Sequence, residues 1–184
     1  MQRELEGPEQ RRIQVHTLHG QVEGMLQTSA GISTMHYLNV LSTSQELVTV
    51  KPPLACPDGW LSPDGPAAIA TDAILFVVEL SEFVPRPGDP REAAQFRRVP
   101  VRLRLGPFVV EGFVHVAPGG DVISRLLQTR HPFLALTSVS VMGPESELTA
   151  PFIAANRRYI AAVQEIPLGT DPPHEVHAVD RAGC

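Results

Sequence analysis

Aromatic residues and cysteines are scarce in this chain of 184 residues. Aromatic side chains make up 5% of the sequence, so a buried core has to be built from Val, Leu, Ile and Ala. The two cysteines, Cys56 and Cys184, have no partners at the spacing of metal ligands. This spacing excludes a cysteine-based zinc module and favours two free thiols in a reducing compartment.

Long hydrophobic runs are also missing. No apolar stretch approaches the roughly 20 residues that a helix needs to cross a bilayer. The first residues, MQRELEGPEQRR, are polar and lack the apolar centre of a secretion signal. We therefore expect a cytoplasmic protein without membrane contact.

Catalytic signatures are absent as well. The chain contains no Gly-x-Ser-x-Gly, no phosphate-binding loop, no dinucleotide fingerprint and no Cys/His nucleophile pair. It has seven histidines, but no four ligands are placed so that they converge as a structural zinc site requires. We expect a protein that is not an enzyme, with no catalytic residue, no metal site and no cofactor.

Turn-forming residues, in contrast, are plentiful. The 18 Pro and 14 Gly predict short elements joined by many turns, which is typical of mainly β folds. The hydrophobic share of 43% is large enough for a buried core.

Two parts of the chain match each other in order. Arg11-Arg12 corresponds to Arg97-Arg98, Val22-Glu23-Gly24 to Val110-Glu111-Gly112, and Gly31 to Gly119. The closing segments AAIATDAILFVVELSE and PFIAANRRYIAAVQEI also match, with Ile69, Asp72, Ile74 and Glu79 at the places of Ile153, Asn156, Ile160 and Glu165. A repeated order of this kind indicates an internal duplication. Chance similarity between two β-rich segments is the alternative.

Each copy is predicted to run strand, strand, short helix, strand, strand, strand. The prediction is a mainly β protein made of two tandem small barrels, since closing a sheet removes exposed edges. The first barrel spans residues 11–84 with a loop insertion at 52–66, and a linker follows at 85–96. The second barrel spans 97–166, and a disordered tail is expected at 167–184.

The predicted loop insertion has no counterpart in the second copy. It contains the only Trp of the chain and two Pro-Asp-Gly turns. Its length is unusual for a connection in a compact domain, which indicates a functional loop or a docking flap. Trp60 and Leu61 are the candidate residues for docking a partner.

The second copy resembles the first motif of Sm-like barrels, in which a glycine within a strand lets that strand bend. The residues that carry the resemblance are Val101, Leu103, Gly106, Val110, Gly112 and Val114. The closing hairpin FIAANRRYIAAVQEI is similar to the second Sm motif and to the FIALN-like hairpin of an uncharacterised group of small bacterial proteins. The resemblance implies a small SH3-like barrel and pairing of strand edges between barrels.

Two departures limit what the resemblance implies. Sm proteins read RNA partly through an Asp-x-x-x-Asn element after the bent strand, where this chain has VAPGGDVISRLL. The predicted helix also lies after the second strand, whereas Sm proteins carry theirs before the first. No residue of this chain therefore inherits an RNA-reading role.

An arginine stripe is predicted on the strand at residues 97–105. Alternation places Val99, Val101, Leu103 and Leu105 on one face and Arg98, Pro100, Arg102 and Arg104 on the other. With Arg97, and with Arg157 and Arg158 in the closing turn, this stripe is a candidate anion or nucleic-acid site, because guanidinium groups match phosphate oxygens. A solvated strand face is the simpler interpretation. The matching face of the first copy, Arg12, Gln14, His16 and Leu18, is not basic.

Two functions remain open from the sequence. The first is a non-enzymatic protein-binding or assembly module that binds a protein partner or itself through strand edges. The alternative is RNA or nucleotide binding through the arginine stripe. Salt dependence separates the two, because phosphate binding weakens steeply as salt rises.

Overall fold

The computed structural model describes residues 9–29, 32–44, 47–57, 59, 61–80, 96–128, 130–144 and 147–167. Cys184, Trp60, most of the expected linker and the tail from 168 onward lie outside this part of the chain. The described strands join one antiparallel sheet in the order β10-β6-β7-β8-β9-β5-β1-β2-β3-β4. The expectation of a mainly β protein is confirmed.

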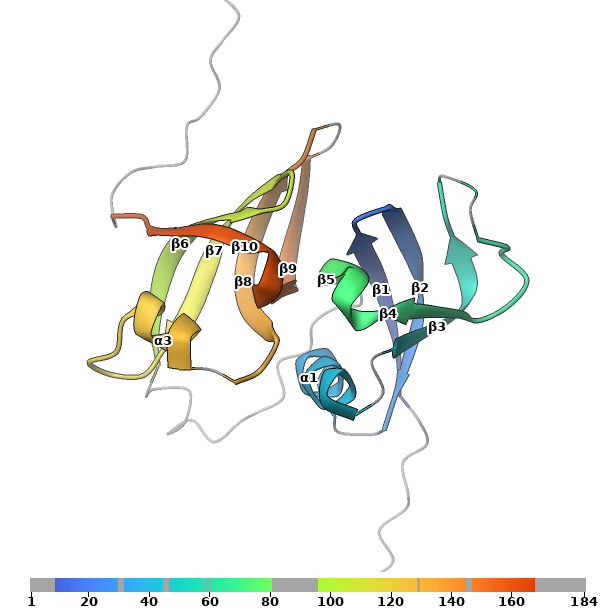
Figure 1. Cartoon of the computed structure of the whole chain (residues 1–184), viewed down its shortest axis with the longest axis horizontal. Helices are drawn as coiled ribbons and strands as arrows, with labels where there is room; N and C mark the ends of the chain where they lie inside the picture. Colours follow the sequence, from blue (N-terminus) through green and yellow to red (C-terminus); the bar gives the residue numbers. More distant parts are fainter. Residues whose placement is uncertain are drawn as a thin grey trace, which may run out of the picture.

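The two halves have the same sequence of elements (Figure 1). The first half consists of β1 (Glu9–Thr17), β2 (Gly20–Thr28), α1 (Thr34–Ser44), β3 (Leu47–Ala55), β4 (Ala67–Ala70), the short 3-10 turn η1 (Thr71–Ala73) and β5 (Ile74–Glu79). The second half consists of β6 (Arg97–Leu105), β7 (Phe108–Val116), α3 (Val122–Gln128), β8 (Phe133–Met142), β9 (Glu147–Asn156), η2 (Arg157–Tyr159) and β10 (Ile160–Glu165).

Strand order within the sheet repeats as well. The first half contributes β5-β1-β2-β3-β4 and the second half contributes β10-β6-β7-β8-β9. One boundary needs correction, because β3 continues through Ala55 and the predicted insertion at 52–66 therefore begins with four strand residues. Pairing with β2, where Glu23 lies opposite Ala55, extends β3 beyond the predicted end.

Side-chain caps begin the two helices. Ser33 Oγ accepts a hydrogen bond from the His36 amide at 3.1 Å. Asp121 Oδ1 accepts one from the Ser124 amide at 2.7 Å, and its Oδ2 accepts one from Ser124 Oγ at 2.6 Å. These hydrogen bonds hold the pKa of Asp121 below its usual value. Short polar side chains before an apolar run thus position both helices.

Glycines in the middle of β2 and β7 allow another strand to approach closely. A Cβ atom on Gly24 would lie 2.5 Å from Val50 Cγ1 and 2.8 Å from the Lys51 carbonyl oxygen. A Cβ atom on Gly112 would lie 3.0 Å from Val139 Cγ2. The pairing register shifts at each of these glycines, so β2 and β7 are irregular at equivalent points.

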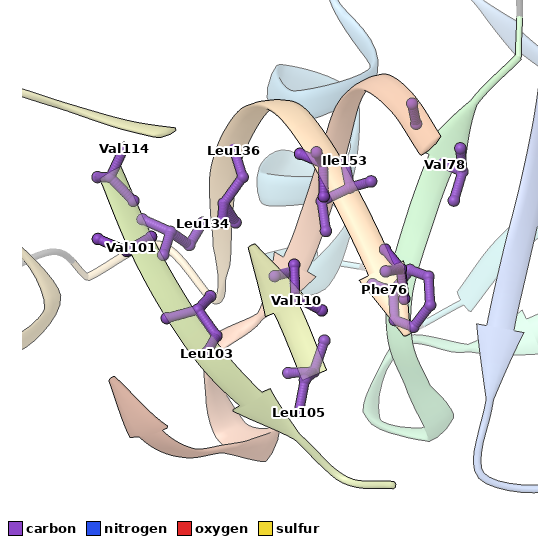
Figure 2. Close-up of a cluster of buried hydrophobic side chains, with 14 of the residues drawn as sticks. Phe76, Val78, Val101, Leu103, Leu105, Val110, Val114, Leu134, Leu136 and Ile153 are labelled. Atoms are coloured by element: carbon purple, nitrogen blue, oxygen red, sulfur yellow. The ribbon is translucent and has the colours of Figure 1, made fainter. Parts of the chain in front are cut away.

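Two hydrophobic clusters fill the halves, and strand β5 contributes to both. Ile74 and Val77 belong to the cluster of the first half, whereas Leu75, Phe76 and Val78 belong to that of the second. Figure 2 shows Phe76 and Val78 together with Ile153 and the side chains of β6 to β8. The second half contributes the buried Phe133 and Ala154 to the first cluster in return, and the partly buried Phe152 packs against it. The two halves therefore share apolar packing across their boundary.

Candidate functional site

The two halves meet through the pairing of β5 with β9, which we call the β5·β9 junction. Phe76, Val77 and Val78 lie opposite Ala155, Ala154 and Ile153 in antiparallel register. All six side chains are buried. The junction thus combines backbone pairing with complete burial of apolar side chains, as in the interior of a single sheet.

Asn156 adds a polar contact to this junction. Its side-chain amide donates to the carbonyl oxygens of Ile74 at 2.9 Å and Thr71 at 3.2 Å, both in the first half. Its Oδ1 accepts a hydrogen bond from the Arg158 amide at 3.1 Å. Asp72, which occupies the matching position in the first half, is exposed. Matching positions of the two halves therefore have an internal role in one half and a surface role in the other.

The two ends of the sheet are formed by β4 and β10. Strand β4 has the place in the first half that β9 has in the second, and β10 has the place in the second half that β5 has in the first. Among the described strands, β4 pairs with β3 alone and β10 pairs with β6 alone. Every residue of β5 is buried, whereas Ala161, Ala162, Gln164 and Glu165 of β10 are exposed. The difference in burial arises because β9 and the rest of the second half cover β5. Each end strand offers unpaired backbone groups for pairing with another strand.

A buried ion pair marks the end of β5. Glu79, only 4% exposed, accepts hydrogen bonds from Arg11 Nη1 at 2.8 Å and from Thr34 Oγ1 at 2.7 Å. In the second half, the exposed Glu165 accepts one from the Val122 amide at 3.3 Å. In both halves the carboxylate that ends the fifth strand thus holds the first residue of the helix.

The arginine stripe has the predicted alternation along β6. Arg98, Arg102 and Arg104 are exposed, and Pro100 on the same face is half-buried. The alternate residues Val99, Val101, Leu103 and Leu105 are buried in the core. Burial and the nearby charges of Arg98 and Arg125 hold the pKa of His115 below its usual value.

Internal contacts already engage much of the stripe. Arg102 Nε and Nη2 both lie 2.6 Å from Glu111 Oε1. Arg98 stacks 4.2 Å above the Phe113 ring and donates to Ser138 Oγ, and Arg97 donates to the Gly120 carbonyl oxygen. Within the described residues, the Arg104 side chain makes no hydrogen bond or ion pair.

The closing-turn arginines differ in role. Arg157 donates to the carbonyl oxygens of His131 and Leu126, so its charge stabilises the end of α3. The Arg158 side chain is exposed and has no partner among the described residues. Of the six arginines predicted to bind an anion, Arg104 and Arg158 are thus the two whose guanidinium groups remain available.

The candidate docking residues are only partly within the described chain. Trp60 lies outside it. Leu61 is half-buried and packs against the hydrophobic cluster of the first half. Leu61 therefore contributes to the first core.

One cavity lies where the two halves adjoin, and we call it the junction cleft. It has a volume of about 650 Å³ and is lined by residues that include His16, Leu18, Gln21, Leu75, Pro107 and Phe108. Two equivalent hairpins form its walls: the β1–β2 turn of the first half and the β6–β7 turn of the second. Both turns lie at the upper end of Figure 1, and the two helices lie at the lower end.

His16 is the most perturbed group of this cleft. Its ring stacks on Phe76 with centroids 4.1 Å apart and meets the edge of Phe108 at 5.7 Å. Its Nε2 lies 2.8 Å from Gln14 Oε1. Burial lowers the pKa of His16 to about 4, so the ring is neutral at pH 7. Sequence alternation placed His16 on the outer face of β1, but this part of the face is covered by Phe108.

Other chemistry is limited in the described part of the chain. No group of three or more His, Cys, Asp and Glu residues there is arranged to hold a metal ion. No helix among the described residues is long and apolar enough to span a membrane. Cys56 is a free, half-buried thiol.

Comparisons with models of protein families, with curated proteins and with solved structures found no match for this chain. Its function must therefore be inferred from its own residues and their geometry.

Proposed function

We propose that this chain is a non-enzymatic assembly module made of two duplicated Sm-like barrels, and that it associates with further copies of itself through its end strands. The observation that carries the proposal is the β5·β9 junction. This junction joins two halves of identical strand order and leaves the equivalent strands, β10 and β4, at the ends of the sheet.

Repetition of the internal junction between chains gives a defined register. Val163 and Gln164 correspond to Val77 and Val78, and Ala70 and Ile69 correspond to Ala154 and Ile153. We expect Val163 of one chain to lie opposite Ala70 of the next, and Gln164 opposite Ile69. Since the contact joins two different edges, it builds a head-to-tail assembly, which becomes a ring when the rotation closes.

Contacts between chains should be weaker than the internal junction. Strand β10 carries Ala162 and Gln164 where β5 carries Phe76 and Val78. Less apolar area is then buried, so less free energy of association is gained. We expect an assembly that forms reversibly and depends on protein concentration.

Light scattering after size-exclusion chromatography tests this proposal. Wild-type protein should have a mass above the 20.0 kDa of one chain, increasing with concentration. Ala162→Asp should return the mass to that of one chain, because it places a charge where Phe76 is buried in the internal junction. Ala162 is exposed within the chain, so this variant should fold normally.

The matched control is Thr149→Asp, which adds the same charge to an exposed strand position paired with Ser140. This variant should remain assembled. A wild-type protein of single-chain mass at every concentration would contradict self-association, and so would an Ala162→Asp variant that assembles normally.

RNA or nucleotide binding through the arginine stripe is the second candidate. The observation in its favour is the outward row of Arg98, Arg102 and Arg104 on β6. Nucleic acid that copurifies at low salt and dissociates at high salt would favour this function. Changing all three arginines to Ser should then abolish binding, whereas assembly through strand edges should be unaffected.

A further inference from the structure

The junction cleft exists only because the two halves are joined. The β1–β2 turn and the β6–β7 turn face each other across it, with Gly20 and Gly106 at positive φ values of 140° and 59°. Pro57 and Pro144, which belong to the β3–β4 and β8–β9 connections, complete its walls. Equivalent connections of both halves therefore contribute to one cavity, at a boundary of the kind where ligand sites commonly occur.

The described residues that line the cleft carry no charge at neutral pH. None of them is Lys, Arg, Asp or Glu, and His16 is the one titratable side chain among them. Burial keeps the His16 ring neutral. A charged ligand would lose its hydration against these residues without gaining an ion pair, so they favour an uncharged ligand.

Two aromatic rings, those of His16 and Phe108, line the cleft. The fully buried Phe76 supports both, because it stacks on His16 and meets Phe108 edge-on with centroids 5.1 Å apart. Phe108 is half-buried, so part of its ring faces the cleft. Flat apolar surfaces of this kind favour a planar ring in a stacked or edge-on arrangement.

An exposed leucine lies at the cleft. Leu18 is 52% exposed at the β1–β2 turn, although turns usually carry polar residues. The half-buried Gln21 side chain supplies a donor and an acceptor in the same cavity. Mostly apolar walls with few polar groups, around a volume of about 650 Å³, are characteristic of small-molecule sites.

We propose that the junction cleft binds one uncharged small molecule that contains an aromatic ring. The ring packs against Phe108 and Leu18, and a polar atom of the ligand bonds to Gln21. The site is separate from the proposed assembly surfaces, because none of the described residues that line it belongs to the end strands β4 and β10.

Fluorescence titration of the full chain with N-phenyl-1-naphthylamine tests the proposal. This uncharged aromatic probe fluoresces strongly in apolar surroundings. Wild-type protein should bind it saturably, with one probe for each chain. The assembly variant Ala162→Asp should bind it equally well, which separates this proposal from the proposed self-association.

Two variants locate the site. Leu18→Arg and Gln21→Arg should each weaken probe binding at least about tenfold, because each places a charge in the cleft. The control is Ile123→Arg, since Ile123 is 56% exposed on α3. This helix lies at the lower end of Figure 1 and the lining turns lie at the upper end, so the change should leave binding unchanged. Circular dichroism verifies that each variant is folded. If Leu18→Arg does not fold, the test of the site rests on Gln21→Arg.

Three results would overturn the proposal. The first is a titration that does not saturate. The second is binding that persists in both cleft variants, and the third is an equal loss of binding in Ile123→Arg.

Discussion

Individual residues at equivalent positions of the two halves have different environments. His16 occupies the place that Arg102 has in the second copy, yet His16 is buried against two aromatic rings and Arg102 is exposed. The cause is the second half, which covers the outer face of β1 near Phe76. The residue types fit these environments. The neutral imidazole of His16 can be buried, whereas the guanidinium of Arg102 could be buried only beside charged or hydrogen-bonding partners.

Acidification should destabilise the protein through His16. Its pKa is about 4 in the folded chain, against 6.5 for the free group, so folding favours the neutral ring. This contribution to stability is complete above pH 6.5 and is lost as the pH falls toward 4. Between pH 7 and pH 5.5 the loss should be about 1 kcal/mol.

Urea unfolding at pH 7 and pH 5.5 measures this loss. His16→Phe keeps an aromatic ring against Phe76 and removes the titrating group, so its free energy of unfolding should change less over the same interval. His115, whose pKa is also lowered, is present in both proteins, so the difference between wild type and His16→Phe isolates the contribution of His16. An equal decline in the variant would show that another group is responsible.

Elements are held together at the boundary by more than strand pairing. Asn156, at the end of β9, donates to the carbonyl oxygens of Thr71, the first residue of η1, and of Ile74, the residue after η1, and so connects the closing turn of one half with that of the other. Glu79, at the end of β5, connects β1 with α1. Polar side chains at strand ends therefore position whole elements.

Removal of the Asn156 amide should weaken the junction. Asn156→Ala leaves two buried carbonyl oxygens without this donor, so we expect a loss of about 1–3 kcal/mol in the free energy of unfolding. The matched control is Asp72→Ala at the equivalent exposed position, which should change stability by less than about 0.5 kcal/mol. Chemical denaturation of both variants provides the measurement, and similar effects in the two would contradict this role of Asn156.

Local sequence patterns predicted where the strands are, but they did not predict where each strand lies in the sheet. The alternation of Val and Arg in β6 predicted which side chains are buried, because each residue of a strand faces one side of the sheet. The segments ILFVVE and IAAVQE also predicted β5 and β10 correctly as strands. Nothing in either segment indicates that one is covered on both sides and the other lies at an edge.

The junction cleft and the partners of the arginine stripe could not be predicted from local sequence patterns either. The junction cleft unites Leu18 with Phe108, which are 90 positions apart, and no periodicity connects them. The arginine stripe was predicted from alternation, but its partners were not, since Glu111 lies on a neighbouring strand. Strand β3 ends at Ala55, later than predicted, because it pairs with β2 as far as that residue. This pairing extends the strand although it contains two prolines.

The whole molecule should unfold as one unit. Leu75, Phe76 and Val78 pack in the second core although β5 pairs with β1 of the first half. Loss of the second core would expose these side chains and leave β5 with one partner. The two halves therefore depend on each other for stability, as cooperative units do.

Val110→Asp tests this dependence. Val110 is fully buried in the second core, and a carboxylate there is strongly unfavourable. Hydrogen exchange followed by mass spectrometry should show that β1 and β2 lose protection together with β6 and β7. Full protection of the first half in this variant would mean that the halves are stable separately.

The sharing of β5 between two cores also constrains how the sequence can change over time. A substitution at Phe76 or Val78 has to fit the packing of the second half, and one at Ile74 or Val77 has to fit that of the first. Almost no position of β5 is free of such a requirement, whereas four of the six residues of β10 are exposed. Among descendants of this protein, β5 is therefore expected to accept fewer replacements than β10, although both strands descend from one segment if the chain arose by duplication.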